Sequence, residues 1–331
     1  MTNAKYDVVA VGNAIIDVLK AVPDAFLAAE NIAKGAMTLI DEPRADHLTE
    51  LFEGAVVAAG GSAANTMTGV ASFGGAAGYI GKVADDELGA RFTREFRAAG
   101  VAFDTPARPA PPGTARSLIA VTSDGQRSMN TYLGASTLLS SADIDAELIS
   151  AGAVLFLEGY LFDREEAKAA FVHAAEIARG AGRKVSLTLS DEFCVERHRE
   201  SFKHLVAGHV DILFANEREI LSLYESRDLS RALQRARGAC PLVVVTRSER
   251  GSLIASNGET IELDAMPTKV VDTTGAGDQF AAGFLFAHAR GRSLKESGAL
   301  ASLAAAEVIS HMGPRPEANL RALALQNGFR V

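Results

Sequence analysis

The chain has 331 residues, of which 48% are hydrophobic and 22% are charged, which is typical of a folded globular protein with a sizeable core. Its net charge of −8 and the absence of any lysine- and arginine-rich run argue against nucleic acid and anionic membranes as partners. Two cysteines are too few for a disulfide framework, and no apolar run approaches the roughly 20 residues of a membrane span, so we expect a cytoplasmic protein.

Short runs rich in β-branched residues alternate with helical patterns along most of the chain. The predicted strands are Asp7–Val11, Gly78–Ile80, Ser117–Val121, Ala153–Leu157, Lys184–Leu189, Asp211–Phe214 and Leu242–Thr246. Residues 62–74 place apolar side chains on one helical face, and the pairs Asp163–Glu166 and Ser293–Glu296 have the spacing of capping boxes. This alternation predicts an α/β fold with a doubly wound, mostly parallel central sheet and helices on both faces.

Two segments interrupt the alternation. Residues from about 18 to 44 contain the apolar run 37–40 among polar and glycine residues. Residues from about 105 to 135 begin with a proline-rich stretch and continue with a strand pattern and a predicted turn at 123–125. The chain shows no internal repeat and no linker, so we expect a single domain with extra strands from these segments.

Residues 272–278 read Asp-Thr-Thr-Gly-Ala-Gly-Asp and precede an apolar run. Gly275, Ala276 and Gly277 leave their backbone N–H groups unshielded where a helix is predicted to begin, and such amides bind anions. Asp278 adds a carboxylate in the first turn. This pair suits phosphoryl transfer, because the amides stabilise charge on the phosphoryl group and the carboxylate takes the hydroxyl proton. The structural alternative is a glycine-rich turn into a buried helix, with Asp278 interacting with the helix dipole.

Four motifs, in this order along the chain, resemble signatures of the ribokinase-like (PfkB) family of sugar and nucleoside kinases. They are Val11–Asp17, similar to the opening strand with its substrate-binding aspartate, Gly60–Asn65, Asn216–Glu219 and Asp272–Leu285. They span nearly the whole chain. Three positions depart from the pattern: Met67 replaces a small residue, and Ala84 and Ser248 each replace a usual glycine. The change at Ser248 would reshape the nucleotide-base pocket.

The resemblance implies a ribokinase-like fold and an enzyme. Residues 1–331 would form one kinase domain, with a small, discontinuous β-sheet lid from about 18–44 and 105–135 closing over the substrate. The activity would be an ATP-dependent phosphotransfer to an alcohol group with Mg²⁺ and, as in many members, K⁺. Its partners would be a nucleoside or sugar and ATP, and the chain would act as a monomer or homodimer.

Asp17 comes just after the apolar run of the first strand, where parallel sheets bind ligands. Its carboxylate can accept hydrogen bonds from two neighbouring hydroxyls, whereas the structural alternative is a solvated loop residue. The glycines at 60 and 61 allow close backbone approach. The resemblance implies substrate contacts from Asn13, Asp17, Met37, Gly60, Gly61, Ser62, Asn65, Tyr160 and Leu161. Met37, Tyr160 and Leu161 would form an apolar wall for a base.

Asn216 and Glu219 follow a predicted strand with the spacing of a capping box, so an N-cap is one interpretation. The resemblance implies that they also organise water-coordinated Mg²⁺ and the phosphates. Arg127 follows the predicted turn and either reaches over the transferring phosphate beside Asp278 or is a solvated surface charge. The implied nucleotide contacts are Asn216, Glu219, Thr246, Arg247, Ser248, Gly251 and Thr274, and the implied K⁺ zone comprises Asp272, Thr274 and residues 310–313.

Residues 13–17, 131–135 and 157–162 resemble the adenosine kinase branch of the family. We therefore expect phosphorylation of the 5′-hydroxyl of a ribonucleoside, adenosine first, in purine salvage. A ribokinase or fructokinase is the alternative enzyme. A non-catalytic nucleoside or nucleotide sensor is the alternative of another class, although a pure binder has no use for Asp278. A dinucleotide-dependent dehydrogenase is disfavoured, because residues 12–17 lack the G-x-G-x-x-G turn.

Overall fold

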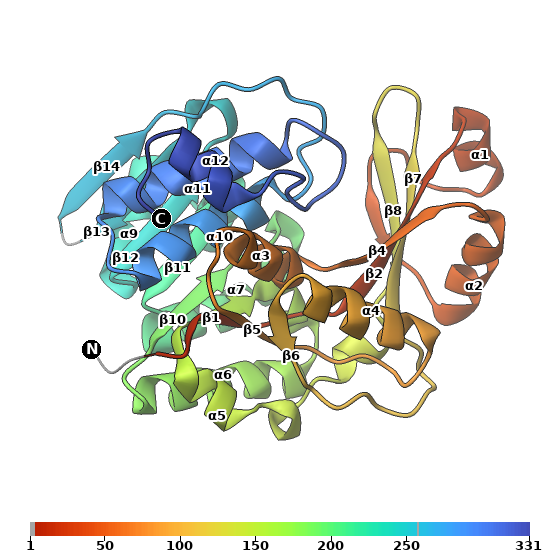
Figure 1. Cartoon of the computed structure of the whole chain (residues 1–331), viewed down its shortest axis with the longest axis horizontal. Coiled ribbons are helices and arrows are strands. Elements are labelled where there is room, and N and C mark those ends of the chain that lie inside the picture. Colours follow the sequence, from red (N-terminus) through yellow and green to blue (C-terminus); the bar gives the residue numbers. More distant parts are fainter. Residues whose placement is uncertain (1–3, 257) are drawn as a thin grey trace.

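The computed structural model describes residues 4–256 and 258–331, and within them the strands form a sheet of nine and a sheet of five. Figure 1 shows the larger sheet inside a body of helices, with the smaller sheet projecting at one side. The order of the large sheet is β14-β13-β12-β11-β10-β9-β1-β5-β6. The strands from β12 to β6 in this order are all parallel, whereas β13 and β14 are antiparallel additions at one edge.

The bounds of the large sheet's strands are β1 Tyr6–Val11, β5 Ala77–Ile80, β6 Val101–Phe103, β9 Gly152–Glu158, β10 Lys184–Thr188, β11 Ile212–Asn216, β12 Leu242–Thr246, β13 Ser252–Ser256 and β14 Glu259–Leu263. The chain adds β5 and β6 on one side of β1, and then β9 to β12 on the other side. The strand order therefore reverses between β1 and β9. In open parallel sheets this reversal opens a crevice at the carboxyl ends of the strands, which is the usual place for a ligand.

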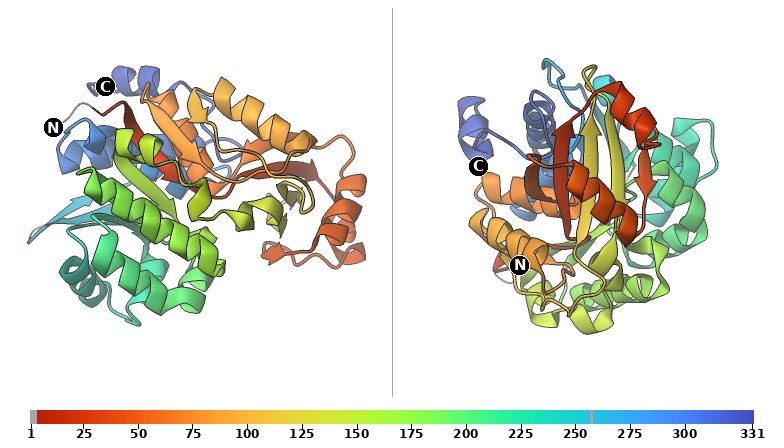
Figure 2. Two further views of the ribbon diagram at one scale, coloured as in Figure 1. Left: turned by 90° about the horizontal axis from the view of Figure 1, so that it is seen from below. Right: turned by 90° about the vertical axis from the view of Figure 1, so that its right-hand side faces the viewer.

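Helices cover both faces of the large sheet. Their bounds are α3 Ser62–Ser72, α4 Glu87–Ala98, α5 Ala146–Ala151, α6 Glu165–Gly180, α7 Glu192–His209, α8 Glu217–Leu223, α9 Leu229–Ala239, α10 Ala276–Ala289, α11 Leu294–Val308 and α12 Leu320–Gln326. Alternate residues of β1 serve the two faces, since Val8 and Ala10 join the core under α3 and α10, whereas Val9 and Val11 join the core under α6 and α7. Figure 2 (left) shows the two helical layers on either side of the sheet.

The small sheet has the order β3-β8-β7-β2-β4. Its strands are β2 Ile15–Ala21, β3 Met37–Leu39, β4 Val56–Gly60, β7 Ala115–Val121 and β8 Arg127–Tyr132, and helices α1 Asp24–Ala29 and α2 Glu42–Leu51 belong to the same region. Both helices lie across its outer face (Figure 2, right). There Leu118 and Ala120 share a hydrophobic cluster with Leu48 of α2. The other face, which carries Asp17 and Ile119, looks toward the large sheet and lines a cavity there.

The doubly wound α/β fold predicted from the sequence is confirmed. Every predicted strand is present within one or two residues of its expected bounds, although 117–121 lies in the small sheet as part of β7. The capping box at Ser293–Glu296 is present. The box predicted at 163–166 does not set its helix, because α6 begins at Glu165 with Arg164 as N-cap. None of the helices in the described part of the chain is long and apolar enough to cross a lipid bilayer.

Candidate active site

A cavity of about 400 Å³ lies where the carboxyl ends of the parallel strands face the small sheet. The large sheet contributes Tyr160 after β9, Asn216 at the end of β11 and Thr246 at the end of β12. The remaining predicted residues at its wall are Asp17, Ser62, Asn65, Arg127, Glu219, Thr274, Gly275, Ala276, Gly277 and Asp278. Residues from distant parts of the sequence, from Asp17 to Asp278, therefore meet at one crevice.

Asp278 sits in the first turn of α10 and is held by the first turns of α3. Its carboxylate accepts a hydrogen bond of 2.6 Å from the Ser62 hydroxyl and one of 3.3 Å from the Asn65 amide. Burial raises the pKa of Asp278 to about 6, although these two hydrogen bonds oppose the rise. A carboxylate with a pKa just below neutrality is ionised at pH 7 and still basic enough to accept a proton from a hydroxyl.

The helix that carries Asp278 begins at a residue in the left-handed conformation. Gly275 is the N-cap of α10 with φ 77°, and a Cβ there would come within 2.5 Å of the Pro314 carbonyl oxygen. Among the described residues, the amides of Gly275 and Gly277 have no hydrogen-bond acceptor, so both are free for an anion. Ala276 differs from the prediction, because its amide donates to the Thr273 carbonyl oxygen at 3.2 Å. The Ala276 amide is therefore engaged within the turn 273–276 and is not free for an anion.

Asp17 projects from β2 into the same cavity. In the described part of the chain no donor is hydrogen-bonded to its carboxylate, and burial raises its pKa to about 6, with the charges of Arg127 and Arg315 opposing the rise. Gly60 of the paired strand β4 leaves room for it, since a Cβ at Gly60 would lie 2.2 Å from the Asp17 Oδ2. Asp17 is therefore a carboxylate placed against a ligand cavity with its acceptors unused.

Glu158 is a buried carboxylate directly behind the cavity that sequence reasoning did not assign to the site. It accepts hydrogen bonds from the Asn13 side-chain amide at 2.7 Å and from the Ala63 backbone N–H at 2.7 Å. Burial raises its pKa to about 7 against these bonds. Asn13, which was predicted to contact the substrate, is thus bonded to Glu158 and is not among the cavity-lining residues. Glu158 fixes the start of α3 and so the position of Ser62.

Arg127 of β8 reaches across the cavity to the loop before α10. Its Nη1 donates to the Asp272 Oδ2 and to the Thr274 Oγ1, each at 2.6 Å. The Oδ1 of Asp272 accepts from the Thr274 amide and hydroxyl, and its Oδ2 also accepts from the Gly313 amide at 2.9 Å. Burial acts to raise the pKa of Asp272, but the hydrogen bonds and the Arg127 charge hold it below its usual value. The carboxylate is saturated with donors, so this arrangement does not fit a K⁺ ion at Asp272.

Asn216 and Glu219 form the capping box that starts α8. The Asn216 side chain accepts from the Glu219 amide at 2.9 Å, while Glu219 accepts from the Asn216 backbone and side-chain amides at 2.9 and 2.6 Å. Burial raises the pKa of Glu219 to about 7, and the charges of Asp191 and Glu192 add to the rise. The structural interpretation of this motif is confirmed. Both residues also line the cavity, where oxygen ligands suit hydrated Mg²⁺, so a role in Mg²⁺ binding stays a prediction.

The loop after β12 carries the remaining predicted nucleotide contacts. Thr246 lines the cavity, whereas Arg247, Ser248 and Gly251 do not. Arg247 donates through its guanidinium to Glu262 of β14 at 2.5 Å. Ser248 adopts φ 53°, a left-handed conformation that favours glycine, which accounts for glycine as the usual residue at this position. Ser248 is therefore held in a conformation that is costly for a residue with a Cβ.

Two residues of the predicted apolar wall do not reach the cavity. Leu161 is buried in the hydrophobic core beside α6 and α7. Met37 is 43% exposed on the edge strand β3, where it pairs with Met129. The small sheet instead presents Ile119 and Met129 to the cavity. These two apolar side chains belong to β7 and β8. Of the predicted apolar wall, Tyr160 alone lines the cavity.

Arg315 and Gln279 are further residues that the sequence did not reveal. The Nε of Arg315 donates to the Asn65 side-chain oxygen at 3.2 Å, which directs the Asn65 amide N–H toward Asp278. The buried Gln279 amide bridges the backbone carbonyls of Asn65 and Pro314 at 3.0 and 3.1 Å. Both contacts join α3 to the segment after α11, about 250 residues away. No local pattern reports such pairings.

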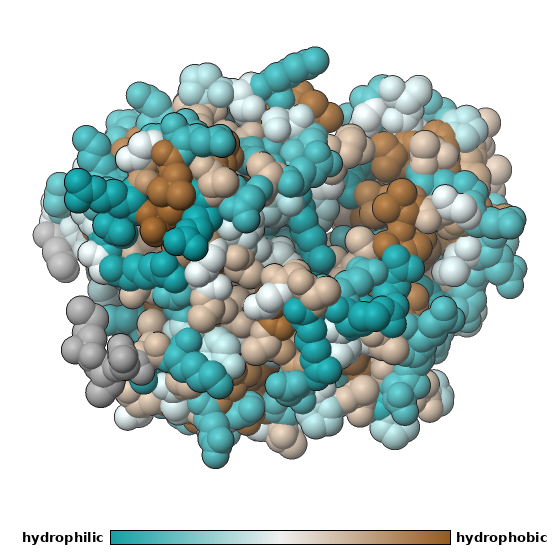
Figure 3. All heavy atoms as spheres, viewed as in Figure 1, coloured by the Kyte–Doolittle hydropathy of each residue, from teal (hydrophilic) through white to brown (hydrophobic). Residues whose placement is uncertain are grey.

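A groove beside the cavity runs along the small sheet and is lined by Leu19, Val56, Met312 and Pro314 among others. Figure 3 shows apolar side chains gathered over the small sheet, next to a hollow between it and the larger body. Asp17 and Pro314 line both the groove and the cavity. The groove therefore leads from solvent to Asp17.

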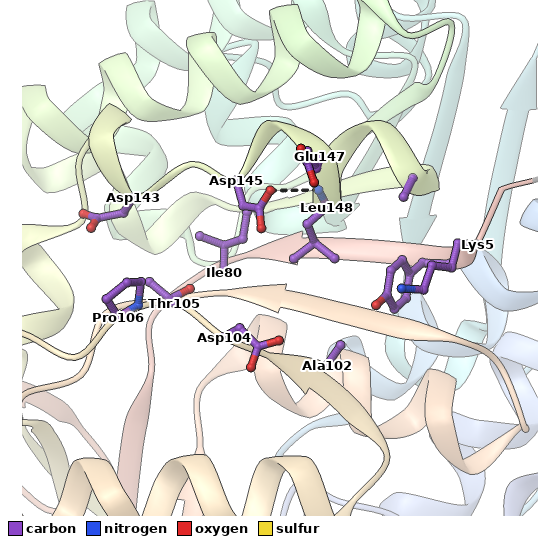
Figure 4. Close-up of a pocket in the computed structure, with 12 residues that line it drawn as sticks. Lys5, Ile80, Ala102, Asp104, Thr105, Pro106, Asp143, Asp145, Glu147 and Leu148 are labelled. Carbon is purple, nitrogen blue, oxygen red and sulfur yellow. Dashed lines mark hydrogen bonds between the residues drawn. The ribbon is translucent and has the colours of Figure 1, made fainter.

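A separate cavity of about 430 Å³ lies near the start of β1 and is lined by Asp104, Asp143, Asp145 and Glu147. Figure 4 shows these carboxylates around it, with Asp145 accepting a hydrogen bond from the Leu148 amide, 2.9 Å in length, at the start of α5. Lys5 lies at its far side. The carboxylates would repel phosphate, and among the described residues no cluster of histidine, cysteine or acidic side chains could hold a metal ion. The predicted catalytic and binding residues line the first cavity and not this one.

The known proteins that this chain resembles are kinases of sugars or nucleosides. Residues 29–319 match the pfkB family of carbohydrate kinases. The structure resembles the adenosine kinase from Sinorhizobium meliloti, with 50% identity and a TM-score of 0.91 over 98% of this chain and 100% of that one. It resembles equally a probable sugar kinase from Rhizobium etli CFN 42, with 48% identity and a TM-score of 0.92 over 98% and 99%. Fructokinase-1 of Oryza sativa subsp. japonica is 30% identical over 242 residues, which are 70% of this chain and 73% of that protein.

Proposed function

The chain belongs to the pfkB family of carbohydrate kinases, which transfer a phosphoryl group to a hydroxyl, and we propose that its acceptor is the 5′-hydroxyl of a ribonucleoside, with adenosine as the first candidate. Membership of a kinase family implies ATP as the phosphoryl donor, typically with Mg²⁺. The observation that carries the proposal is the pair of carboxylates in one cavity. Asp17 has unused acceptors for a diol, and Asp278 stands at the free amides of a helix N-terminus.

The reaction assigns one role to each carboxylate. Asp17 accepts hydrogen bonds from the 2′- and 3′-hydroxyls, which leaves the 5′-hydroxyl to approach Asp278. Asp278 accepts the proton of this hydroxyl as its oxygen bonds to the γ-phosphorus of ATP, and the bond to the β-phosphate oxygen breaks to release ADP. The amides of Gly275 and Gly277 stabilise the negative charge on the transferred group. Mg²⁺ would neutralise phosphate charge, held through water by Asn216 and Glu219.

The small sheet completes this site as a lid over the substrate in our proposal. It supplies Asp17 from β2 and Arg127 from β8, together with the apolar side chains of Ile119 and Met129. A free sugar has no use for apolar side chains beside its hydroxyls, whereas a nucleoside base stacks on them. The similarity to the Sinorhizobium meliloti adenosine kinase supports the same choice.

A free-sugar kinase is the second candidate, because a probable sugar kinase and a fructokinase are also relatives of this chain. We propose to compare adenosine, 2′-deoxyadenosine, ribose and fructose by ADP release at equal concentration. Adenosine should exceed ribose, because only adenosine can use the apolar side chains. Removal of the 2′-hydroxyl leaves one acceptor of the Asp17 carboxylate without its donor, although the 3′-hydroxyl still donates. An unmade hydrogen bond to a charged group costs on the order of 1.5–3 kcal/mol, so 2′-deoxyadenosine should lose about one to two decades in kcat/KM.

The substitution Asp17→Ala serves as the control for the diol contact. It should remove most of the discrimination against 2′-deoxyadenosine while lowering the rate with adenosine itself. Preferential turnover of ribose or fructose would move the chain to the sugar-kinase branch and leave the role of Asp278 unchanged. Tight binding of adenosine without ADP formation would contradict the proposal altogether.

A further inference from the structure

The guanidinium of Arg127 places a positive charge against the loop before α10. The ion pair of Arg127 with Asp272 is deeply buried, since the side chains are 9% and 6% exposed. Burying an ion pair costs desolvation energy, and further hydrogen bonds to its atoms offset part of that cost. Here the same nitrogen also donates to the Thr274 hydroxyl at 2.6 Å, so one positive group binds two oxygens of the loop.

The two carboxylate oxygens of Asp272 have no acceptor capacity left for an ion. Each Asp272 oxygen accepts two hydrogen bonds, from Thr274 and from Arg127 and Gly313 respectively. The Thr274 hydroxyl donates to Asp272 and accepts from Arg127. A K⁺ ion that binds the Asp272 carboxylate would have to displace one of these donors, and its charge would be repelled by the buried guanidinium.

We propose that Arg127 is a built-in cation, which takes the place of K⁺ at Asp272 and Thr274 and makes phosphoryl transfer by this chain independent of monovalent cations. Arg127 is then a positioning residue. Through Asp272 and Thr274 it orders the loop that leads to Gly275 and Gly277, whose amides receive the phosphoryl group. The catalytic part of this inference rests on the proposed kinase function, whereas the binding of the cation does not.

Arg127 connects the small sheet to the loop before α10, because its backbone belongs to a strand of the sheet and its guanidinium donates to the loop. Arg127 belongs to β8, where its strand pairs with β7 at Val121, and Asp272 lies 145 residues away. Among the described residues, its Nε and Nη2 are buried without an acceptor. These two donors remain for an anionic ligand in the cavity after Nη1 has bound the loop. Through Nη1 the small sheet therefore helps to order the loop.

The test measures initial rates in KCl, NaCl and tetramethylammonium chloride at one ionic strength, with the acceptor that the wild-type protein prefers. Wild-type rates should agree within about twofold in the three salts. Arg127→Ala should lose on the order of 10- to 100-fold in tetramethylammonium chloride, as expected for a lost charged hydrogen bond, and should recover in part with KCl or guanidinium chloride. Arg127→Lys keeps a charge and should show no K⁺ response. Arg116→Ala is the matched control, because Arg116 also lies in the small sheet but pairs with Asp46, outside the cavity.

A binding measurement without substrate decides the same question. A ligand that binds only the folded state raises the thermal midpoint, so KCl compared with tetramethylammonium chloride should raise the midpoint of Arg127→Ala and leave the wild-type and Arg127→Lys proteins unchanged. A wild-type rate that needs K⁺ by tenfold or more would overturn the inference. An Arg127→Ala protein that responds to K⁺ in neither rate nor midpoint would do the same. Failure of every acceptor in the panel would contradict the proposed function instead, and the midpoints would still decide the cation question.

Discussion

Asp278 belongs to α10 but receives both of its side-chain hydrogen bonds from α3, through Ser62 and Asn65. Asn65 is itself oriented by Arg315, since the Asn65 oxygen accepts from the Arg315 Nε and the nitrogen must then point to Asp278. The Asp278 carboxylate is therefore held at a fixed angle, and its environment also sets its basicity. Burial and the nearby Asp17 charge raise its pKa, whereas the two hydrogen bonds lower it.

At this scale we predict that Asp278→Asn lowers kcat by roughly 10²–10⁴-fold, the usual effect of losing a positioned general base. The amide is isosteric and can still accept from Ser62, so the protein should fold with a similar thermal midpoint. Steady-state kinetics and thermal denaturation of the same preparation measure the two effects.

The matched control for that substitution is Asp228→Asn. Asp228 is an N-cap at the surface that accepts from the amides of Ser230 and Arg231, and asparagine caps helices equally well. Its kcat should not change. An Asp278→Asn protein that folds and retains nearly full kcat would show that another group takes the hydroxyl proton.

Two capping boxes in this chain have the same chemistry but different surroundings. The box of α8 pairs Asn216 with Glu219 and lines the cavity, whereas the box of α11 pairs Ser293 with Glu296 at the surface. In both boxes the glutamate accepts from the backbone amide of the cap residue, at 2.9 and 3.0 Å. Matching substitutions of the two glutamates can therefore be compared. If both affect stability alike but only the one at the cavity changes the kinetics, the kinetic change comes from the position of Glu219 at the cavity.

We predict that Glu219→Gln raises the Mg²⁺ concentration needed for half-maximal rate by at least severalfold. The change in thermal midpoint should be small, because the glutamine oxygen can still accept from the Asn216 backbone amide and close the box, and only the hydrogen bond from the Asn216 side chain is lost. Glu296→Gln should change neither quantity. Rates at a series of Mg²⁺ concentrations with fixed ATP measure the requirement. An unshifted requirement in Glu219→Gln would leave this glutamate with a structural role alone.

Strands with continuous apolar runs were predictable, whereas several other strands, both at the edges and inside the sheets, were not. The parallel strands buried on both faces read as apolar runs, and the sequence predicted β1, β5 and β9 to β12. The edge strands β4 and β14 were missed because their exposed residues weaken the apolar signal. The capping box at 163–166 was wrong because the turn Gly159–Asp163 continues the chain from β9, and the helix begins after it.

For the molecule as a whole, the site was predictable wherever a motif is local and hidden wherever it depends on long-range pairing. The motif 272–278 predicted the free amides and Asp278 as parts of the site, and the motif Gly60–Asn65 predicted Ser62 and Asn65. The contact of Arg127 with Asp272 joins residues 145 apart, and that of Arg315 with Asn65 joins residues 250 apart. Such contacts follow from the packing of whole layers, so no short pattern contains them. Glu158 was hidden for the same reason, since its role depends on Asn13 and Ala63.

The cavity concentrates buried carboxylates, and this should make the stability of the whole molecule depend on pH. Burial raises the pKa of Glu158 and Glu219 to about 7 and that of Asp17 and Asp278 to about 6. Between the unfolded and folded pKa values the folded state binds more protons than the unfolded state, so stability falls as pH rises. For Glu158 this contribution is fully present below about 4.5 and is lost as pH rises through about 7.

We therefore predict that Glu158→Gln removes part of this dependence. Glutamine has no charge to bury, but the NH2 of its side-chain amide cannot accept a hydrogen bond, which adds a cost that does not vary with pH. The free energy of unfolding of the wild-type protein relative to the variant should be largest at the acidic end of the series, toward pH 4.5, fall through about pH 7 and level off above about pH 8. Urea denaturation at each pH measures it. Glu296→Gln is the control, because hydrogen bonds from Ser293 hold the Glu296 pKa below its usual value and the carboxylate is ionised in both states above pH 5.5. Parallel curves for the wild-type and Glu158→Gln proteins would mean that Glu158 stays ionised in the folded protein, and its hydrogen bonds to Asn13 and Ala63 would then outweigh its burial.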